Sequence, residues 1–300
     1  FFSTETYTNK LIEFIDENRD DGQPFFAWLA YTAPHWPIQL PDDWRNRNTG
    51  RYNEGYDSVR EQRFSRAKEL GIFSPDLDLS SYRPTAPSWA SLSEDERATQ
   101  SRAMELYAGM VENMDYHVGR LITYLRDTDQ LENTVVMFIS DNGPDSNERT
   151  PNVIGLSYVV DNSLENMGAV DSWVAYGRGW AEAATAPLRG TKAAMSEGGT
   201  RVSAFINHDE VRSGDLDDSY LTYMDIAPTI LEITGTRAPS GVFEGREVLP
   251  MTGRSFWTRS QDDGEPVYGP NDPIGSELHG SRALVRGHWK ILMTEETGEW

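Results

Sequence analysis

An acidic and an amide side chain directly follow an apolar run near the middle of the chain. Asp141 and Asn142 come after residues 134–140, which the pattern predicts as a buried strand, and Gly143 follows them. Their oxygens are hard ligands suited to Ca²⁺ or Mg²⁺, and ligands bind outside the carboxyl ends of strands in open α/β sheets. The same residue types are typical of a turn that ends a strand. The pattern alone therefore leaves a metal site and a plain turn open.

Two basic side chains have the chemistry to bind an anion. His35 follows the apolar run 25–31, where it would donate a hydrogen bond or shuttle a proton. Lys192 lies in a glycine-flanked loop and would act as a point charge on a sulfate or phosphate oxygen. A structurally satisfied loop histidine and a solvated surface lysine are the competing interpretations.

Three aromatic residues lie in the long, glycine-rich segment 141–200. Trp173, Tyr176 and Trp180 either wall an apolar substrate pocket or pack the loop. Loops of this length are uncommon in compact domains and usually functional, so the segment is expected to carry part of a site.

The elements that must position these residues alternate between helix and strand. Helices are expected from Ser3 or Thr4, over 58–70, from a capping box at Ser93 and Glu96, and over 223–233. An apolar stripe is expected to face the core from the third helix: Tyr107, Met110, Met114, Val118, Leu121 and Leu125. Buried strands are expected over 25–31 and 134–140, a further strand over 202–206, and antiparallel strands over 283–285 and 289–293. The alternation predicts an α/β sheet with parallel strands.

Composition excludes several classes of function. The chain has 300 residues, with 27 Lys and Arg against 48 Asp and Glu, a net charge of −21. This charge argues against nucleic acid or an anionic membrane as the main partner. No apolar run is long enough to span a membrane. The absence of cysteine excludes disulfides, cysteine-ligated metal and a cysteine nucleophile within these residues.

Together the motifs resemble the sulfatase family, and more narrowly bacterial arylsulfatases, in order over nearly the whole chain. The matching segments are residues 24–37, 107–115, 139–143, 180–201, 225–229 and 275–283. The resemblance implies an α/β/α sandwich of the alkaline-phosphatase-like type, followed by the start of a small C-terminal antiparallel-sheet domain. It places the catalytic domain in residues 1–250 and the beginning of the smaller subdomain in 251–300.

The resemblance also implies an activity and a site. The activity is hydrolysis of small-molecule sulfate monoesters around a Ca²⁺ ion. Asp141 and Asn142 would be two metal ligands, and His35 and Lys192 would hydrogen-bond the sulfate near the bridging ester oxygen. Such groups neutralise sulfate oxygens and stabilise charge on the leaving oxygen.

The sequence departs from the family pattern at the nucleophile. The family uses a formylglycine made in a Cys/Ser-x-Pro-x-Arg motif, yet the chain has no Cys and no Ser two residues before any of its 16 prolines. None of its Asp-Asp pairs follows a buried strand, although the family places one after the first strand. We therefore expect the nucleophile, the remaining metal ligands and any targeting signal to lie in an N-terminal part of the parent protein. The 300 residues alone are expected to be inactive.

Two other functions remain open, and the compartment is undetermined. A phosphoesterase of the same superfamily would need further Asp and His ligands for a second metal. A non-catalytic relative would bind anions or partners without turnover. Both a periplasmic and a cytoplasmic location fit the sequence.

Overall fold

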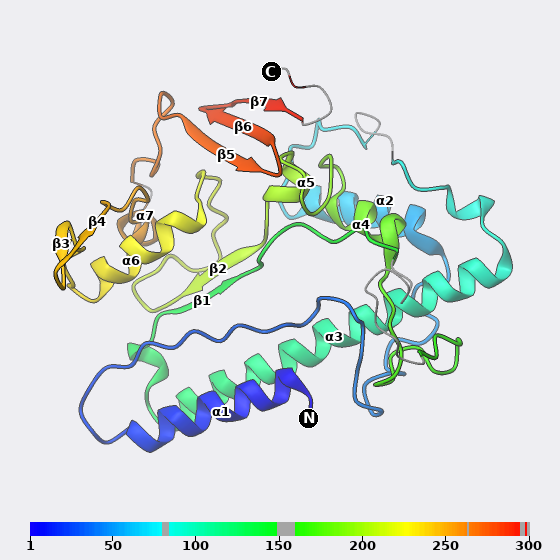
Figure 1. The fold of residues 1–300 in the computed structure, drawn as a ribbon, viewed down its shortest axis with the longest axis horizontal. Helices are drawn as coiled ribbons and strands as arrows, with labels where there is room; N and C mark the ends of the chain where they lie inside the picture. The colour runs from blue at the N-terminus through cyan, green and yellow to red at the C-terminus, as the bar shows by residue number, and fades with distance from the viewer. Residues whose placement is uncertain (80–83, 149–159, 263, 295–297, 299–300) are drawn as a thin grey trace. The chain divides into compact units, whose positions relative to one another are not determined.

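The longest element of the computed structural model is helix α3, Glu94–Asp127, which begins at the predicted capping box (Figure 1). The Ser93 hydroxyl accepts a hydrogen bond from the Glu96 backbone N–H at 3.2 Å, and the Glu96 carboxylate accepts one from the Ser93 N–H at 2.8 Å. These two bonds satisfy N–H groups that the first turn leaves without helical partners. The sequence prediction of this helix is confirmed.

The structure describes residues 1–79, 84–148, 160–262, 264–294 and 298. The chain forms two units: Phe1–Glu132 with Ser140–Val202, and Asn133–Ile139 with Ser203–Trp300. Each has its own set of packed elements, and they are described in turn. No helix among the described residues is long and apolar enough to cross a membrane.

In the first unit, helix α1, Ser3–Asn18, lies along α3 (Figure 1). The hydroxyl of Tyr124 on α3 donates to Asp16 on α1 at 3.0 Å. The helix begins at Ser3, one of the two predicted starting residues, and Phe2 holds the N-cap position. Thr4 is instead buried inside the helix, where the Thr8 hydroxyl donates to its carbonyl oxygen at 2.9 Å.

The buried face of α3 is rotated from the predicted stripe. Met110 is buried as expected, but Leu106, Asn113 and His117 are buried beside it. Of the other stripe positions, Leu125 is buried, while the remaining four are half-buried. The apolar spacing therefore predicts the side of the helix that packs, but it misses two polar residues at the centre of that side.

The core of the first unit is built around aromatic side chains. Helices α2, Gly55–Glu69, and α4, Gly177–Thr185, pack together (Figure 1). Trp180 of α4 is 1% exposed, stands edge-on to Tyr56 at 5.7 Å, and donates its indole N–H to the Gln100 carbonyl at 2.9 Å. A buried tryptophan with a hydrogen-bonded N–H contributes packing without a stranded polar group.

The prediction of a buried strand over residues 25–31 is wrong. This segment has no strand assignment and is mostly exposed, with Phe26 and Trp28 each 70% accessible. A strand needs a neighbour for its backbone N–H and C=O groups, and no described strand pairs with this one. The apolar composition alone cannot supply that partner.

The second unit contains a sheet that includes most of the predicted strand 134–140. Strand β1, Val136–Ile139, pairs with β2, Ala204–Asn207, and the rings of Phe138 and Phe205 stack at 5.2 Å. Both strands were predicted, but the pairing is antiparallel rather than parallel, and β1 is half-buried rather than buried. A short apolar strand does not encode the direction of its partner.

Short elements complete the molecule. In the second unit, η5, Tyr223–Asp225, runs into α6, Ile226–Ile233, as predicted, and β5–β7 form an antiparallel C-terminal sheet. The remaining bounds are η2, Trp89–Ser91; η3, Leu131–Asn133; α5, Glu197–Thr200; β3, Gly241–Phe243; β4, Arg246–Val248; α7, Trp257–Gln261; β5, Ile274–Leu278; β6, Ser281–Arg286; and β7, Trp289–Met293. The predicted C-terminal strands are thus confirmed, while the domain boundary at residue 250 stays a prediction.

Candidate active site

His35 and Lys192, 157 residues apart in the sequence, are in contact. Lys192 Nζ lies 3.2 Å from His35 Nε2. His35 is exposed in the loop that follows residues 25–31, and Lys192 is half-buried in the loop between α4 and α5. The two side chains form one basic pair, which we call the His35–Lys192 pair, on the surface of the first unit.

The contacts of His35 define the positions of its protons. Its Nδ1 lies 2.6 Å from the backbone oxygen of Trp36. Because a carbonyl oxygen only accepts, Nδ1 must carry the proton, and Nε2 then accepts from the Lys192 ammonium. In this arrangement His35 is neutral and Lys192 supplies the positive charge of the pair.

Asp145 supports this pair through Trp36, the residue after His35. The sequence did not identify Asp145 as a site residue. Its Oδ2 accepts a hydrogen bond from the Trp36 indole N–H at 2.8 Å. Burial raises the pKa of Asp145, but hydrogen bonds from Trp36 and Asn147 and the charge of Lys192 outweigh this and hold the pKa below its ordinary value. The ionised carboxylate therefore fixes the residue next to His35. Nothing in its spacing distinguishes Asp145 from an aspartate that simply forms a turn.

Glycines bring the turn after β1 against the loop that carries Lys192. The Gly143 N–H donates to the Gly199 carbonyl at 3.0 Å, and the Lys192 N–H donates to the Pro144 carbonyl at 2.9 Å. A Cβ at Gly143 would lie 2.0 Å from the Gly198 oxygen, which no side chain tolerates. The close approach of these two backbones therefore depends on glycine.

Asp141 and Asn142 lie in this same turn. The Asn142 side-chain amide donates from Nδ2 to the Gly143 carbonyl at 2.9 Å, so its other atom, Oδ1, is the one suited to a cation. Asp141 is exposed. Oxygen donors fit Ca²⁺, but that ion takes six to eight of them, and no group of three or more potential metal-binding His, Cys, Asp or Glu residues occurs in the described part of the chain. The two side chains fit part of a calcium site.

The three aromatic candidates divide between the site and the core. Trp180 belongs to the aromatic core, and Tyr176 is buried and stacked on Tyr107 at 4.6 Å. Burial raises the pKa of Tyr176 well above its ordinary range, which keeps the phenol neutral. Trp173 is half-buried, 6.2 Å from the Trp36 ring. Of the three, Trp173 is the one that lies against the residue next to His35.

Two loops thus bring a basic pair close to a turn that carries the oxygen ligands of Asp141 and Asn142. The sequence model of the family described as Sulfatase matches residues 1–236. An arylsulfatase of Klebsiella aerogenes is 35% identical over 263 residues, covering 85% of this chain and 55% of the relative. An uncharacterized sulfatase of Schizosaccharomyces pombe (strain 972 / ATCC 24843) is 39% identical over 310 residues, covering 100% of the chain and 55% of the relative. The chain belongs to the sulfatase family.

Solved structures agree on the fold. Ps i-CgsB, crystallised in complex with k-i-k-neocarrahexaose, matches 98% of this chain with a TM-score of 0.58 at 21% identity, over 46% of its own length. BT4656, in complex with its substrate D-glucosamine-2-N,6-O-disulfate, matches 97% with a TM-score of 0.50 at 18% identity, over 60% of its length. These likenesses support the predicted fold class, alkaline-phosphatase-like α/β. The chain spans about half the length of the curated relatives it matches.

Proposed function

We propose that the protein containing this chain hydrolyses sulfate monoesters, and that the His35–Lys192 pair holds the ester at its bridging oxygen. The observation that supports this most is the 3.2 Å contact between Lys192 Nζ and His35 Nε2. Hydrolysis of a sulfate ester releases its alcohol, so negative charge develops on the bridging oxygen as the S–O bond breaks. A nearby ammonium lowers the energy of that charge.

Each residue of the pair has a distinct role in this proposal. Lys192 places its positive charge at the leaving oxygen. His35 keeps Nδ1–H on the Trp36 carbonyl, so its Nε2 accepts from Lys192 and orients that ammonium towards the bridging oxygen. Asp145 holds Trp36 and balances the charge of Lys192. The pair can thus bind an anion although the whole chain is strongly acidic.

Asp141 and Asn142 are proposed to contribute oxygen ligands to Ca²⁺. The bound ion would draw electron density from the sulfate oxygens and so favour attack at sulfur. The formylglycine of the family has no matching motif in these 300 residues. This chain alone is proposed to bind calcium weakly and to be inactive.

The test uses the full-length protein, after mass spectrometry has verified its formylglycine, with 4-nitrophenyl sulfate in CaCl2. We expect turnover that EDTA abolishes, and a loss of kcat/KM of about 10²–10³-fold in Lys192→Ala and His35→Ala. The matched controls are Lys10→Ala, an exposed lysine paired with Glu13, and His288→Ala, an exposed histidine of the second unit. Both controls should retain wild-type kinetics.

Two results would contradict the proposal. One is absence of sulfate release despite verified formylglycine, as a non-catalytic relative would give. The other is faster turnover of 4-nitrophenyl phosphate than of the sulfate, which would make the protein a phosphoesterase of the same superfamily.

A further inference from the structure

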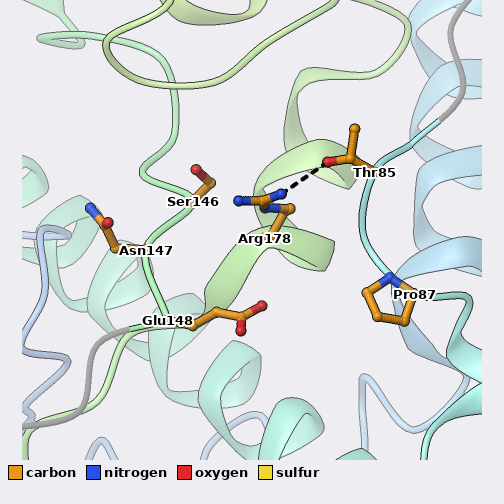
Figure 2. Close-up of a pocket in the computed structure, with 6 residues that line it drawn as sticks. All are labelled: Thr85, Pro87, Ser146, Asn147, Glu148 and Arg178. Carbon is orange, nitrogen blue, oxygen red and sulfur yellow. Dashed lines mark hydrogen bonds between the residues drawn. The ribbon is translucent and has the colours of Figure 1, made fainter.

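A polar pocket of about 330 Å³ opens in the first unit beside the loop of Asp145 (Figure 2). Three segments line it: the chain before α3, the loop after Asp145, and the first turn of α4. Its lining residues are Thr85, Pro87, Ser146, Asn147, Glu148 and Arg178. The side chains of all but Pro87 carry hydrogen-bonding groups, so the pocket suits a polar ligand.

The pocket adjoins the His35–Lys192 pair through Ser146. The Ser146 hydroxyl lies 3.1 Å from that of Thr191, the residue before Lys192. Asp145, the residue before Ser146, binds the indole of Trp36, which follows His35. This wall of the pocket therefore contacts the segment of Lys192 through Thr191 and is joined to the segment of His35 through Asp145 and Trp36. A substrate held by the pair would extend toward it.

A buried carboxylate organises the opposite wall. Glu182 of α4 is 5% exposed and accepts hydrogen bonds from the Thr85 N–H, the Thr85 hydroxyl and the Ala86 N–H. With its proton donated to Glu182, the Thr85 hydroxyl accepts from the Arg178 guanidinium at 3.3 Å. Arg178 is thereby directed across the pocket, as Figure 2 shows. This wall is assembled before any ligand arrives.

Arg178 and Glu148 provide opposite charges on the same cavity. Within the described residues neither forms an ion pair, so both keep hydrogen-bonding capacity. A hydroxyl group can accept from a guanidinium and donate to a carboxylate at the same time. An aromatic ring would instead strip water from both charges and return no hydrogen bond. Neighbouring hydroxyls therefore match this lining better than a flat ring does.

We propose that this pocket is the subsite for the alcohol portion of the substrate, and that it selects sulfate esters of polyhydroxylated alcohols over aryl sulfates. Arg178 and Glu148 bind adjacent hydroxyls while the His35–Lys192 pair holds the ester. The proposal rests on the proposed sulfatase function, which it extends to the class of substrate.

The test compares the full-length protein on two kinds of ester: 4-nitrophenyl sulfate, and the 6-sulfates of glucose, galactose and N-acetylglucosamine. We expect at least one hexose 6-sulfate to give the higher kcat/KM. In Arg178→Met and Glu148→Gln, the kcat/KM ratio of that ester to 4-nitrophenyl sulfate should fall about tenfold or more, mainly through KM. Arg66→Met, an exposed arginine of α2 paired with Glu69, should leave the ratio unchanged.

An unchanged ratio in both pocket variants would overturn the subsite. So would hydrolysis of 4-nitrophenyl sulfate without hydrolysis of any hexose 6-sulfate. Failure of the sulfatase function itself has a different signature, because no ester of either kind would then release sulfate. In that event, calorimetry with glucose 6-sulfate still decides the pocket: weaker binding by Arg178→Met supports it, and equal or absent binding overturns it.

Discussion

Single hydrogen bonds determine how the His35–Lys192 pair can act. The Trp36 carbonyl holds the proton of His35 on Nδ1, and the Asp145 carboxylate holds the Trp36 ring. Lys192 is therefore the group of the pair that brings a positive charge, and its charge lies next to the ionised Asp145. The effect of removing it should depend on how much charge the leaving oxygen develops.

We expect the effect of Lys192→Met to grow with the basicity of the leaving alcohol. Phenol is a poorer leaving group than 4-nitrophenol, so its oxygen bears more charge in the transition state and depends more on the ammonium. The loss of kcat/KM should be about tenfold greater for phenyl sulfate than for 4-nitrophenyl sulfate, measured in the full-length protein. Lys10→Met serves as the control. Equal losses on the two esters would show that Lys192 binds the sulfate without assisting departure of the alcohol.

The buried carboxylate of Glu182 contributes to the stability of the first unit. Its two carboxylate oxygens accept hydrogen bonds from three donors in Thr85 and Ala86. In Glu182→Gln the amide NH2 would face those donors, leaving buried polar groups unpaired. We expect the free energy of unfolding to fall by about 2 kcal/mol, measured by urea unfolding. Glu61→Gln, an exposed position on α2, should change it by less than about 0.5 kcal/mol. A similar, small change in both variants would contradict the buried role.

At the scale of elements, the packing of α3 buries a titratable group. His117 is 4% exposed, and its Nδ1 accepts from the Arg120 guanidinium at 3.0 Å. Burial, reinforced by the charge of Arg120 and only partly opposed by Glu5, lowers the pKa of His117 below 6.5. The folded chain therefore prefers the neutral imidazole.

This shift makes the stability of the chain depend on pH. The unfolded chain, with an ordinary histidine pKa of about 6.5, takes up the proton first as pH falls. The contribution of His117 is thus fully present above about pH 6.5 and is lost as pH falls through the folded-state pKa. Between pH 7.5 and 5.5, wild type should lose more stability in urea unfolding than His117→Gln. His279→Gln, at an exposed turn, should retain the wild-type slope, and identical slopes in all three proteins would refute the assignment.

Elements whose hydrogen bonds are local can be predicted from the sequence, whereas elements that need a partner from a distant part of the chain cannot. The capping box at Ser93 and Glu96 predicts the start of α3 because both of its hydrogen bonds lie within four residues. The run 25–31 has equally clear strand composition, yet it is exposed and unpaired among the described strands. A strand depends on a neighbour that its own residues do not specify.

In the candidate site too, some residues are predictable from the sequence and others are defined only by long-range contacts. His35 and Lys192 were candidates by residue type and position, a resemblance over nearly the whole chain implied that both bind the sulfate, and they are in contact. Spacing alone could not join them, since 157 residues separate them. Asp145 and the polar pocket were missed, because their roles arise from contacts such as Trp36 to Asp145, across 109 residues. Residues that recur as motifs are predictable from sequence, and the residues that support them require the structure.

At the scale of the whole molecule, charge is the dominant property. Acidic residues outnumber basic ones by 48 to 27, a net charge of −21. Like charges on a folded chain repel one another more strongly than on the expanded unfolded chain, which lowers stability. The basic pair and Arg178 are thus local cationic sites on an anionic protein, and the proposed anionic substrate must approach against the overall charge.

Screening should accordingly stabilise the chain. The Debye length falls from about 30 Å at 0.01 M salt to about 10 Å at 0.1 M, so repulsion across the molecule weakens. Raising NaCl from 10 to 200 mM at pH 7.5, in EDTA, should raise Tm by about 2–4 °C, equivalent to about 1 kcal/mol. Tetramethylammonium chloride at the same ionic strength should give an equal rise, since screening does not depend on the identity of the cation. A rise with sodium alone would indicate specific ion binding, and a fall in Tm with both salts would mean that attractive ion pairs outweigh the net repulsion.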